Sequence, residues 1–168
     1  MIQDALLKIV YGMYVITSNA DGNMNGMIAT TACQVTAEPI RMTVTVSKNN
    51  FSHQLIVKSG VFGVSVLRRD TDFSFIGRFG FKSGRDFNKL ENINFSIGQT
   101  GVPLISDNSI AVAECRVISS LDAGTHTIFL AEVVYARILS DEPALTYEYY
   151  HTVIKGKSPK NAPTYIAK

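Results

Sequence analysis

Four short segments of the chain carry hydroxyl, amide and cationic side chains that are suited to binding an anion. The first is NGMIATTACQV at residues 25–35, which is expected to enter a β-strand that carries Thr30 and Thr31 among small residues. Short hydroxyl side chains beside small residues let Oγ atoms and backbone N–H groups converge on a phosphate. A Thr-Thr pair is also common in plain β-strands, because β-branched side chains favour strands. The pair alone therefore leaves a phosphate site and an ordinary strand both open.

The other three segments are SKNNFSH at 47–53, FGFKSGRD at 79–86 and GTHTIFLAEV at 124–133. Arg85 is suited to a phosphate because a guanidinium donates two parallel, charge-assisted hydrogen bonds. Taken alone, Lys48 is interpreted as a solvated lysine at a strand end. Taken alone, His126 is interpreted as a structural histidine that begins a strand, with catalysis as the alternative.

The sequence lacks the motifs of several other kinds of site. It contains no GxSxG elbow, no GxGxxG after a strand and no GxxxxGK[ST] loop. The three histidines are isolated from one another and Cys33 and Cys115 form no CxxC pair, so no metal site is expected. A redox reaction on this chain therefore needs a bound cofactor to carry the electrons.

In their order and spacing, the four segments resemble the flavin reductase family of FMN-binding split barrels, especially the NADH-oxidising flavin domain at the front of high-molecular-weight rubredoxins. The resemblance extends over nearly the whole chain, through YYHTVIKGKSPKNAPTY at 149–165. It implies a mainly β protein, an antiparallel split β-barrel of Greek-key type with a few short helices. It also implies hydride transfer from NADH or NADPH to bound FMN. The electrons then pass to a separate acceptor, which is a rubredoxin-type protein, free flavin, ferric iron or oxygen.

The resemblance also implies roles for individual residues. His126 lies in GTHT, which matches a GDHT-like motif, and is expected to be catalytic near the flavin and the nicotinamide. Because Thr125 stands where many relatives carry Asp, the charge of His126 at neutral pH stays open. The cofactor-binding residues implied are Asn25, Met27, Ile28 and Ala29 at the isoalloxazine ring, Ser47, Lys48 and Asn49 at the ribityl chain and the polar ring edge, Thr30, Thr31, Ser83 and Arg85 at the phosphate, Phe81 against a ring, and His53, which faces either the cofactor or solvent.

Two other kinds of protein share these motifs. A flavoredoxin-like electron carrier binds FMN without being an enzyme, and differs in that NAD(P)H does not reduce its flavin quickly. A split barrel can also hold another ligand, such as haem or a deazaflavin, in which case the yellow colour of a flavin is missing.

Composition and charge favour one soluble domain with small-molecule or protein partners. The 168 residues are 46% hydrophobic, which suffices for one full core and leaves no room for a second large one. The net charge is +2 and no basic run occurs, so neither nucleic acid nor a membrane surface is an expected partner. No apolar run approaches the about 18 residues of a membrane span, and no signal peptide is recognisable. Both cysteines are expected to be reduced and buried, and the protein to be cytoplasmic.

Local patterns predict the elements that position these segments. A short helix is expected within residues 1–10, a hairpin turn at 19–26, and strands at 41–47, 61–67, 109–121 and 125–139. Ser52 and Asp70 are the expected N-caps of two helices, and Phe73, Phe75 and Phe79 are expected in the core. Residues 1–150 are expected to form the barrel domain. Residues 151–168 are expected to form an extended arm that packs on the partner of a homodimer.

Overall fold

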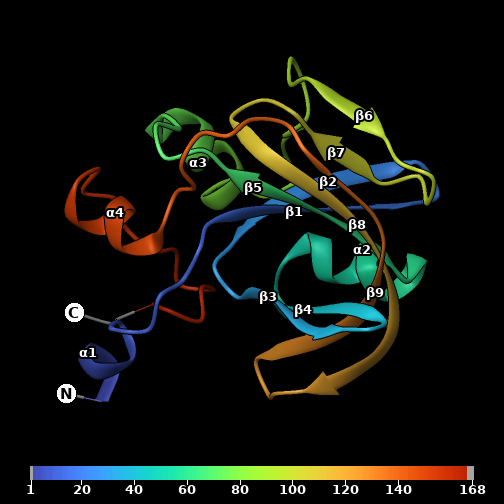
Figure 1. Ribbon diagram of the computed structural model, residues 1–168, viewed down its shortest axis with the longest axis horizontal. Coiled ribbons are helices and arrows are strands. Elements are labelled where there is room, and N and C mark those ends of the chain that lie inside the picture. Colours follow the sequence, from blue (N-terminus) through green and yellow to red (C-terminus); the bar gives the residue numbers. More distant parts are fainter. Residues whose placement is uncertain (1, 166–168) are drawn as a thin grey trace.

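The computed structural model describes residues 2–165, and a curled antiparallel sheet is the largest part of the fold (Figure 1). Its seven strands occur in the order β2-β1-β5-β8-β9-β4-β3, and β6 and β7 form a small separate pair. The strands are β1 (Tyr14–Ala20), β2 (Asn23–Ala29), β3 (Ala32–Ala37), β4 (Ile40–Ser47), β5 (Val61–Leu67), β6 (Phe95–Ile97), β7 (Pro103–Ile105), β8 (Ser109–Asp122) and β9 (His126–Ile138). The helices are α1 (Ile2–Leu6), α2 (Phe51–Ser59), α3 (Phe73–Gly80) and α4 (Tyr147–Thr152). The expected mainly β antiparallel architecture is confirmed.

The sheet closes on itself at residues 30–31. Strands β2 and β3 lie at opposite ends of the sheet order but are consecutive in the chain. The backbone N–H of Thr45 on β4 donates to the Thr31 carbonyl at 3.0 Å, which ties this crossing to the far side of the sheet. Helix α2 packs against β1, β2 and β4. A barrel that is closed in this way leaves the end of β2, the end of β4 and the start of α2 beside one another.

The two long strands β8 and β9 supply most of the curvature, as Figure 1 shows. Their register shifts between Glu114 and Cys115 and again between Val117 and Ser119. Such bulges bend a strand and increase its twist, which lets one strand pair span both halves of the barrel. Both strands lie within one or two residues of the ranges that the sequence predicted.

The expected hairpin between β1 and β2 is confirmed, but it turns earlier than expected. Asp21 and Gly22 have φ values of 52° and 81°, the conformation of a two-residue hairpin turn, and β2 already begins at Asn23. The prediction that Thr30 and Thr31 lie in a strand is wrong, because β2 ends at Ala29 and β3 begins at Ala32. The two threonines occupy the crossing where the chain leaves one sheet edge for the other.

Two predicted helix caps are shifted by two residues. Helix α2 begins at Phe51 after Asn50, and Ser52 lies buried in its first turn. Helix α3 begins at Phe73, and its cap is Asp72, whose carboxylate accepts a hydrogen bond from Phe75 N at 2.8 Å. In each case the predicted cap and the observed cap are two residues apart, and both residue types can cap a helix. The local sequence does not distinguish between them.

Burial corrects two further expectations. Cys33 is exposed on the edge strand β3, although Cys115 is buried as expected and both thiols are free. Burial raises the pKa of the Cys115 thiol to about 12. Phe75 and Phe79 lie in the core, but Phe73 is 51% exposed at the start of α3. Phe75, Ile76 and Phe79 share the buried face of α3, and at 100° per residue Phe73 lies outside that face.

Candidate functional site

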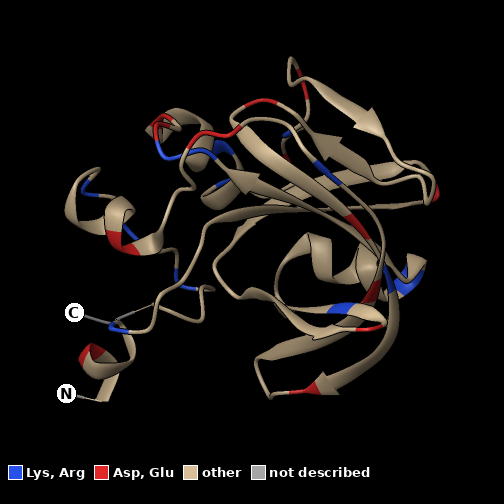
Figure 2. Cartoon of the chain, viewed as in Figure 1, with Lys and Arg blue, Asp and Glu red and all other residues tan. Residues whose placement is uncertain are grey.

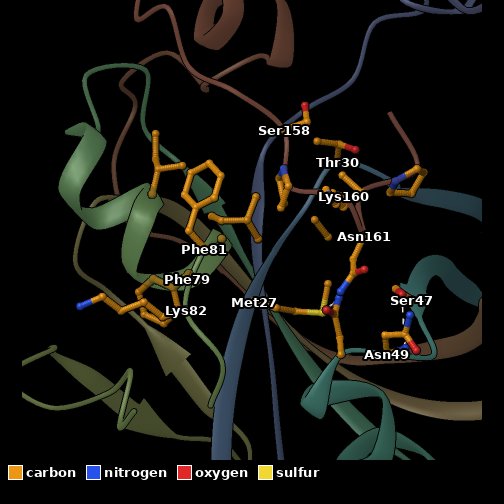
Figure 3. Close-up of a pocket in the computed structure, with 18 of the residues that line it drawn as sticks. Met27, Thr30, Ser47, Asn49, Phe79, Phe81, Lys82, Ser158, Lys160 and Asn161 are labelled. Atoms are coloured by element: carbon orange, nitrogen blue, oxygen red, sulfur yellow. Dashed lines mark hydrogen bonds between the residues drawn. The ribbon is translucent and has the colours of Figure 1, made fainter. Parts of the chain in front are cut away.

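A cavity of about 400 Å³ lies between the end of β2, the end of β4 and the turn that follows α3. Figure 3 shows Phe79 and Phe81 on one side of it, Ser47 and Asn49 on the other, and Met27 between them. Most of the predicted site residues line this cavity. They are Asn25, Met27, Ile28, Ala29, Thr30, Ser47, Asn49, Phe81, Ser83, Arg85 and His126.

The hydroxyl of Thr30 is a buried polar group of the cavity that indicates a ligand-binding site. Thr30 is 6% exposed, and its Oγ1 has no hydrogen-bond partner among residues 2–165. A buried hydroxyl without a partner is costly and rare in native proteins. Thr30 also lines the cavity, so a ligand that enters the cavity can supply the partner.

The turn after α3 brings Ser83 and Arg85 to the mouth of the cavity. Ser83 Oγ accepts a hydrogen bond from Arg85 N at 3.2 Å, which orders the turn. Arg85 Nη1 donates to the carbonyl of Asn49 at 3.3 Å, and the guanidinium lies 5.4 Å from the centre of the Phe51 ring. One cation therefore joins the turn after α3 to the connection between β4 and α2.

Gly84 allows this turn to approach β2 closely. A Cβ atom at Gly84 would lie 2.1 Å from Oδ1 of Asn25, which is closer than any real contact. Asn25 is buried, and its Nδ2 donates to Ser52 Oγ on α2 at 2.9 Å. Glycine at 84 and the buried amide at 25 together set the width of the cavity at this point.

Three predicted site residues, Thr31, Lys48 and His53, do not line the cavity. Thr31 Oγ1 donates to the Thr45 carbonyl at 3.4 Å, and Lys48 forms an exposed ion pair with Asp122 at 2.7 Å. His53 lies on the β9 side of α2, where Nε2 is 2.8 Å from the hydroxyl of Thr127. Burial, assisted by the charge of Lys48, lowers the pKa of His53 below its ordinary value. A cofactor-binding role for these three residues stays a prediction, without support from their positions.

His126 has partners on both ring nitrogens. Nε2 lies 3.0 Å from the carbonyl oxygen of Asn161, and Nδ1 lies 2.8 Å from Oγ1 of Thr125. A carbonyl oxygen can only accept, so Nε2 carries a proton, and in the neutral ring Nδ1 accepts from the threonine hydroxyl. Among the described residues, a hydroxyl and a backbone carbonyl therefore orient the His126 ring, in place of the carboxylate that many relatives carry at position 125.

The segment 157–164, here called the covering segment, lies over the cavity, and the sequence did not predict this position. Every residue from Lys157 to Thr164 lines the cavity, and Figure 3 shows Ser158, Lys160 and Asn161 beside Thr30. Tyr150 OH on α4 donates to the Lys157 carbonyl at 3.0 Å, and the Tyr147 hydroxyl bonds to Ser158. The two prolines in this stretch indicated an extended arm, but its support here is the same chain. Helix α4 also crosses the domain boundary predicted at 150/151.

Lys89 is a second residue that the sequence gave no signal for. It is 5% exposed, lines the cavity, and its Nζ donates to the carbonyls of Gly26 and Phe79, each at 3.0 Å. Burial lowers its pKa to about 8. A lone lysine between Asn88 and Leu90 is indistinguishable in sequence from a solvated surface residue.

Positive charge predominates in the cavity. Its lining contains Lys82, Arg85, Lys89, Lys157 and Lys160, and no Asp or Glu among the residues that the structure describes. Figure 2 shows basic residues beside α3 and along the chain after α4, which form two of its walls. Apolar side chains from β2 and α3, including Met27 and Phe79, supply the rest. The arrangement suits a ligand with a flat apolar part and an anionic part.

Within residues 2–165, no group of three or more His, Cys, Asp or Glu side chains is placed to hold a metal ion. None of the described helices is long and apolar enough to cross a membrane.

The chain belongs to the flavin reductase like family, whose domain profile matches residues 6–156. It is 43% identical over 163 residues to a ferric-chelate reductase (NAD(P)H) of Archaeoglobus fulgidus, which covers 97% of this chain and 96% of the relative. It is 40% identical over 161 residues to a high molecular weight rubredoxin of Moorella thermoacetica, which covers 96% of this chain and 70% of the relative. The resemblance stated from the sequence motifs is confirmed.

Solved structures share the fold. An NADH:FAD oxidoreductase of Streptomyces globisporus superposes with a TM-score of 0.78 at 24% identity, over 86% of each chain. A flavoredoxin from Methanosarcina acetivorans superposes with a TM-score of 0.71 at 23% identity, over 77% of this chain and 69% of the other. Both matches support the split-barrel fold.

Proposed function

We propose that this protein is an NAD(P)H-dependent flavin oxidoreductase that holds FMN in the cavity beneath the covering segment. The observation that carries the proposal is the buried, unpartnered hydroxyl of Thr30 in a cavity lined by cations and by no described carboxylate. Membership of the flavin reductase like family supports it, as do relatives named as NAD(P)H-dependent ferric-chelate reductase and NADH-dependent FMN reductase.

The residues present fit FMN at both ends. The phosphate needs donors and positive charge, which Thr30, Ser83 and Arg85 in the cavity lining supply. The ring system needs a flat apolar slot, which Met27 and Phe81 help to form. Glycine at position 84 lies against Asn25, and any side chain at this position would clash with the Asn25 amide. When bound, FMN supplies the hydride-accepting chemistry that no side chain of this protein provides.

The chain itself positions the reactants and excludes water. The covering segment shields the cavity, and its Asn161 carbonyl accepts the hydrogen bond from Nε2–H of His126. A nicotinamide that reaches His126 must therefore replace this contact, after which Nε2–H can donate to the carboxamide oxygen. We assign His126 this orienting role, and no residue of the chain needs to act as a proton donor to the ring.

The acceptor of the electrons is proposed to be a separate molecule. Ferric chelates, free flavin, oxygen and a rubredoxin-type protein are the candidates, and two relatives carry the names ferric-chelate reductase and high molecular weight rubredoxin. Only Cys33 and Cys115 occur in this chain, too few for a four-cysteine iron site of its own.

We further propose that two copies form a homodimer in the cytoplasm. Strands β8 and β9 leave Ile118, Leu121, Val134 and Ile138 exposed, and a second copy can cover them. Two free thiols in place of a disulfide favour a reducing compartment. Light scattering should give twice the 18.4 kDa of the chain, and a mass of one chain would contradict the dimer.

The test of the function is the visible spectrum of the protein with FMN, recorded without oxygen before and after NADH or NADPH. A bound flavin band that bleaches within seconds is expected. A bound flavin that stays oxidised with both nicotinamides would instead identify a flavoredoxin-like carrier. Absence of bound flavin would overturn the cofactor assignment.

A further inference from the structure

The cavity contains one buried cation for which the structure provides no counter-ion. Lys89 is 5% exposed, and no carboxylate in the described part of the chain forms an ion pair with it. Its two hydrogen-bond partners, the carbonyls of Gly26 and Phe79, are neutral. A buried ammonium that is solvated only by neutral dipoles is costly, because water is lost and no opposite charge replaces it.

A purely structural role accounts for only part of this arrangement. Lys89 joins β2 to the last turn of α3, the two elements that supply the apolar walls of the cavity. The two backbone carbonyls need only hydrogen-bond donors, which a neutral side chain can also supply, so the positive charge of Lys89 is not needed to join these elements. An ammonium also has three N–H donors, and the two carbonyls occupy two of them. The side chain lines the cavity, so the remaining donor and the charge are available to a ligand there.

We propose that Lys89 is a cofactor-binding residue that supplies the buried counter-charge for the phosphate of FMN. This inference rests on the proposed function. Direct contact is not required, because a unit charge within about 10 Å, at an effective dielectric constant of about 20, changes a binding constant by about tenfold. Oxidised FMN carries its full charge on the phosphate, so the effect should follow the phosphate and be absent for riboflavin.

Linkage then determines how affinity depends on pH. In the free protein burial lowers the pKa of Lys89 to about 8, so the side chain is mostly charged at pH 7 and mostly neutral at pH 9. A bound anion favours the charged form and raises this pKa. FMN must therefore bind more tightly at pH 7 than at pH 9, by about fivefold when the charge of Lys89 strengthens binding about tenfold, because Lys89 in the complex also loses part of its charge by pH 9.

The two elements packed against the Lys89 side chain contribute few other ionisable groups. Strand β2 has none, and α3 contributes only Arg78, whose Nη1 donates to the carbonyls of Lys89 and Glu91. Burial raises the pKa of Tyr150 above its ordinary value, away from this range. The remaining ionisable groups of the same loop or cavity are Lys82, Arg85, Asp86, Glu91, His126, Tyr147, Lys157 and Lys160.

The experiment measures the dissociation constants of FMN and riboflavin between pH 7 and pH 9, by quenching of flavin fluorescence. For the unmodified protein, FMN affinity should fall about fivefold over this range while riboflavin affinity stays constant. Lys89→Met, an unbranched substitution without charge, should bind FMN about tenfold more weakly at pH 7 and show no dependence on pH. Lys58→Met, which removes an exposed lysine on α2 that pairs with Asp21, is the matched control and should behave as the unmodified protein.

The outcomes separate the inference from the proposed function. FMN that binds with the same affinity at pH 7 and pH 9, or riboflavin that shows the same slope as FMN, overturns the role of Lys89 and leaves the flavin site in place. If FMN does not bind at pH 7 at all, the proposed function itself fails. The unmodified protein alone decides between these outcomes, so the conclusion does not depend on the folding of the Lys89 variant.

Discussion

The unpartnered hydroxyl of Thr30 allows a substitution that affects stability and binding in opposite directions. Thr30→Val keeps the shape of the side chain and removes the polar atom. In the protein without ligand, the buried Oγ1 has no partner, so its loss should leave the free energy of unfolding unchanged or raise it by up to about 1–3 kcal/mol. With FMN, the same hydroxyl is expected to donate to a charged phosphate oxygen, and such a bond contributes about 1.5–3 kcal/mol.

The expected result is FMN affinity that falls about 10- to 150-fold without any loss of stability in the ligand-free protein. Urea unfolding of the ligand-free protein measures the first quantity, and quenching of flavin fluorescence measures the second. The reasoning is refuted if Thr30→Val destabilises the ligand-free protein by more than about 1 kcal/mol, since the hydroxyl would then have a partner of its own.

Thr31→Val is the matched control, because it makes the same chemical change at the next residue. Thr31 does not line the cavity, and its Oγ1 already donates to the Thr45 carbonyl at 3.4 Å. It should lose about 0.5–1 kcal/mol of stability and bind FMN normally. Equal weakening of FMN binding by both substitutions would show that the crossing at 30–31 meets the phosphate differently from the arrangement proposed here.

Three further substitutions test other parts of the site and fold. Arg85→Ala should weaken FMN binding at least about tenfold, with little change in the melting temperature, because the lost contacts are exposed; equilibrium dialysis against FMN measures it, and unchanged affinity would exclude a phosphate contact. Gly84→Ala should abolish tight FMN binding, since its Cβ would lie 2.1 Å from Oδ1 of Asn25; binding equal to that of the unmodified protein would show that the turn moves freely. Hydrogen bonds from Ser74 and Phe75 N lower the pKa of Asp72, so its charge stabilises the fold at neutral pH and this contribution disappears as the pH falls below about 4. Asp72→Ala should therefore cost about 1 kcal/mol at pH 7 and less at pH 3 in urea unfolding, and an equal cost at both values would contradict the cap.

Much of the architecture follows from local patterns in the chain. Alternation of Val44 and Val46 with polar residues indicated β4, and both are buried on one face of that strand. The density of turn-forming residues at 19–26 indicated the first hairpin, which forms because Asp21 and Gly22 accept positive φ values. These features depend on interactions between residues that are close in sequence, and a pattern in the sequence records them directly.

The sequence predicted helix caps and the burial of single residues less well. Asn50 and Ser52 can both cap a helix, as can Asp70 and Asp72. The cap is the residue that has an extended conformation at the end of the preceding strand or loop, and this depends on the tertiary structure. Cys33 was expected in the core because cysteine is usually buried, but β3 is the edge strand of the sheet and leaves it exposed.

The residue types of the site were present in the sequence, but their positions relative to the cavity were not. Thr30 and Thr31 have the same side chain and adjacent positions, yet only Thr30 lines the cavity, because the barrel closes between them. Lys48 and Lys89 are both single lysines, and one lies in an exposed ion pair while the other is buried beneath the cavity. Alternation and turn chemistry are properties of neighbouring residues, whereas a cavity is formed by segments that are more than a hundred residues apart in the chain, such as β2 and the covering segment. Which side chains face that space, and which lose water there, is settled only when the sheet has curled and the last segment has packed across its end.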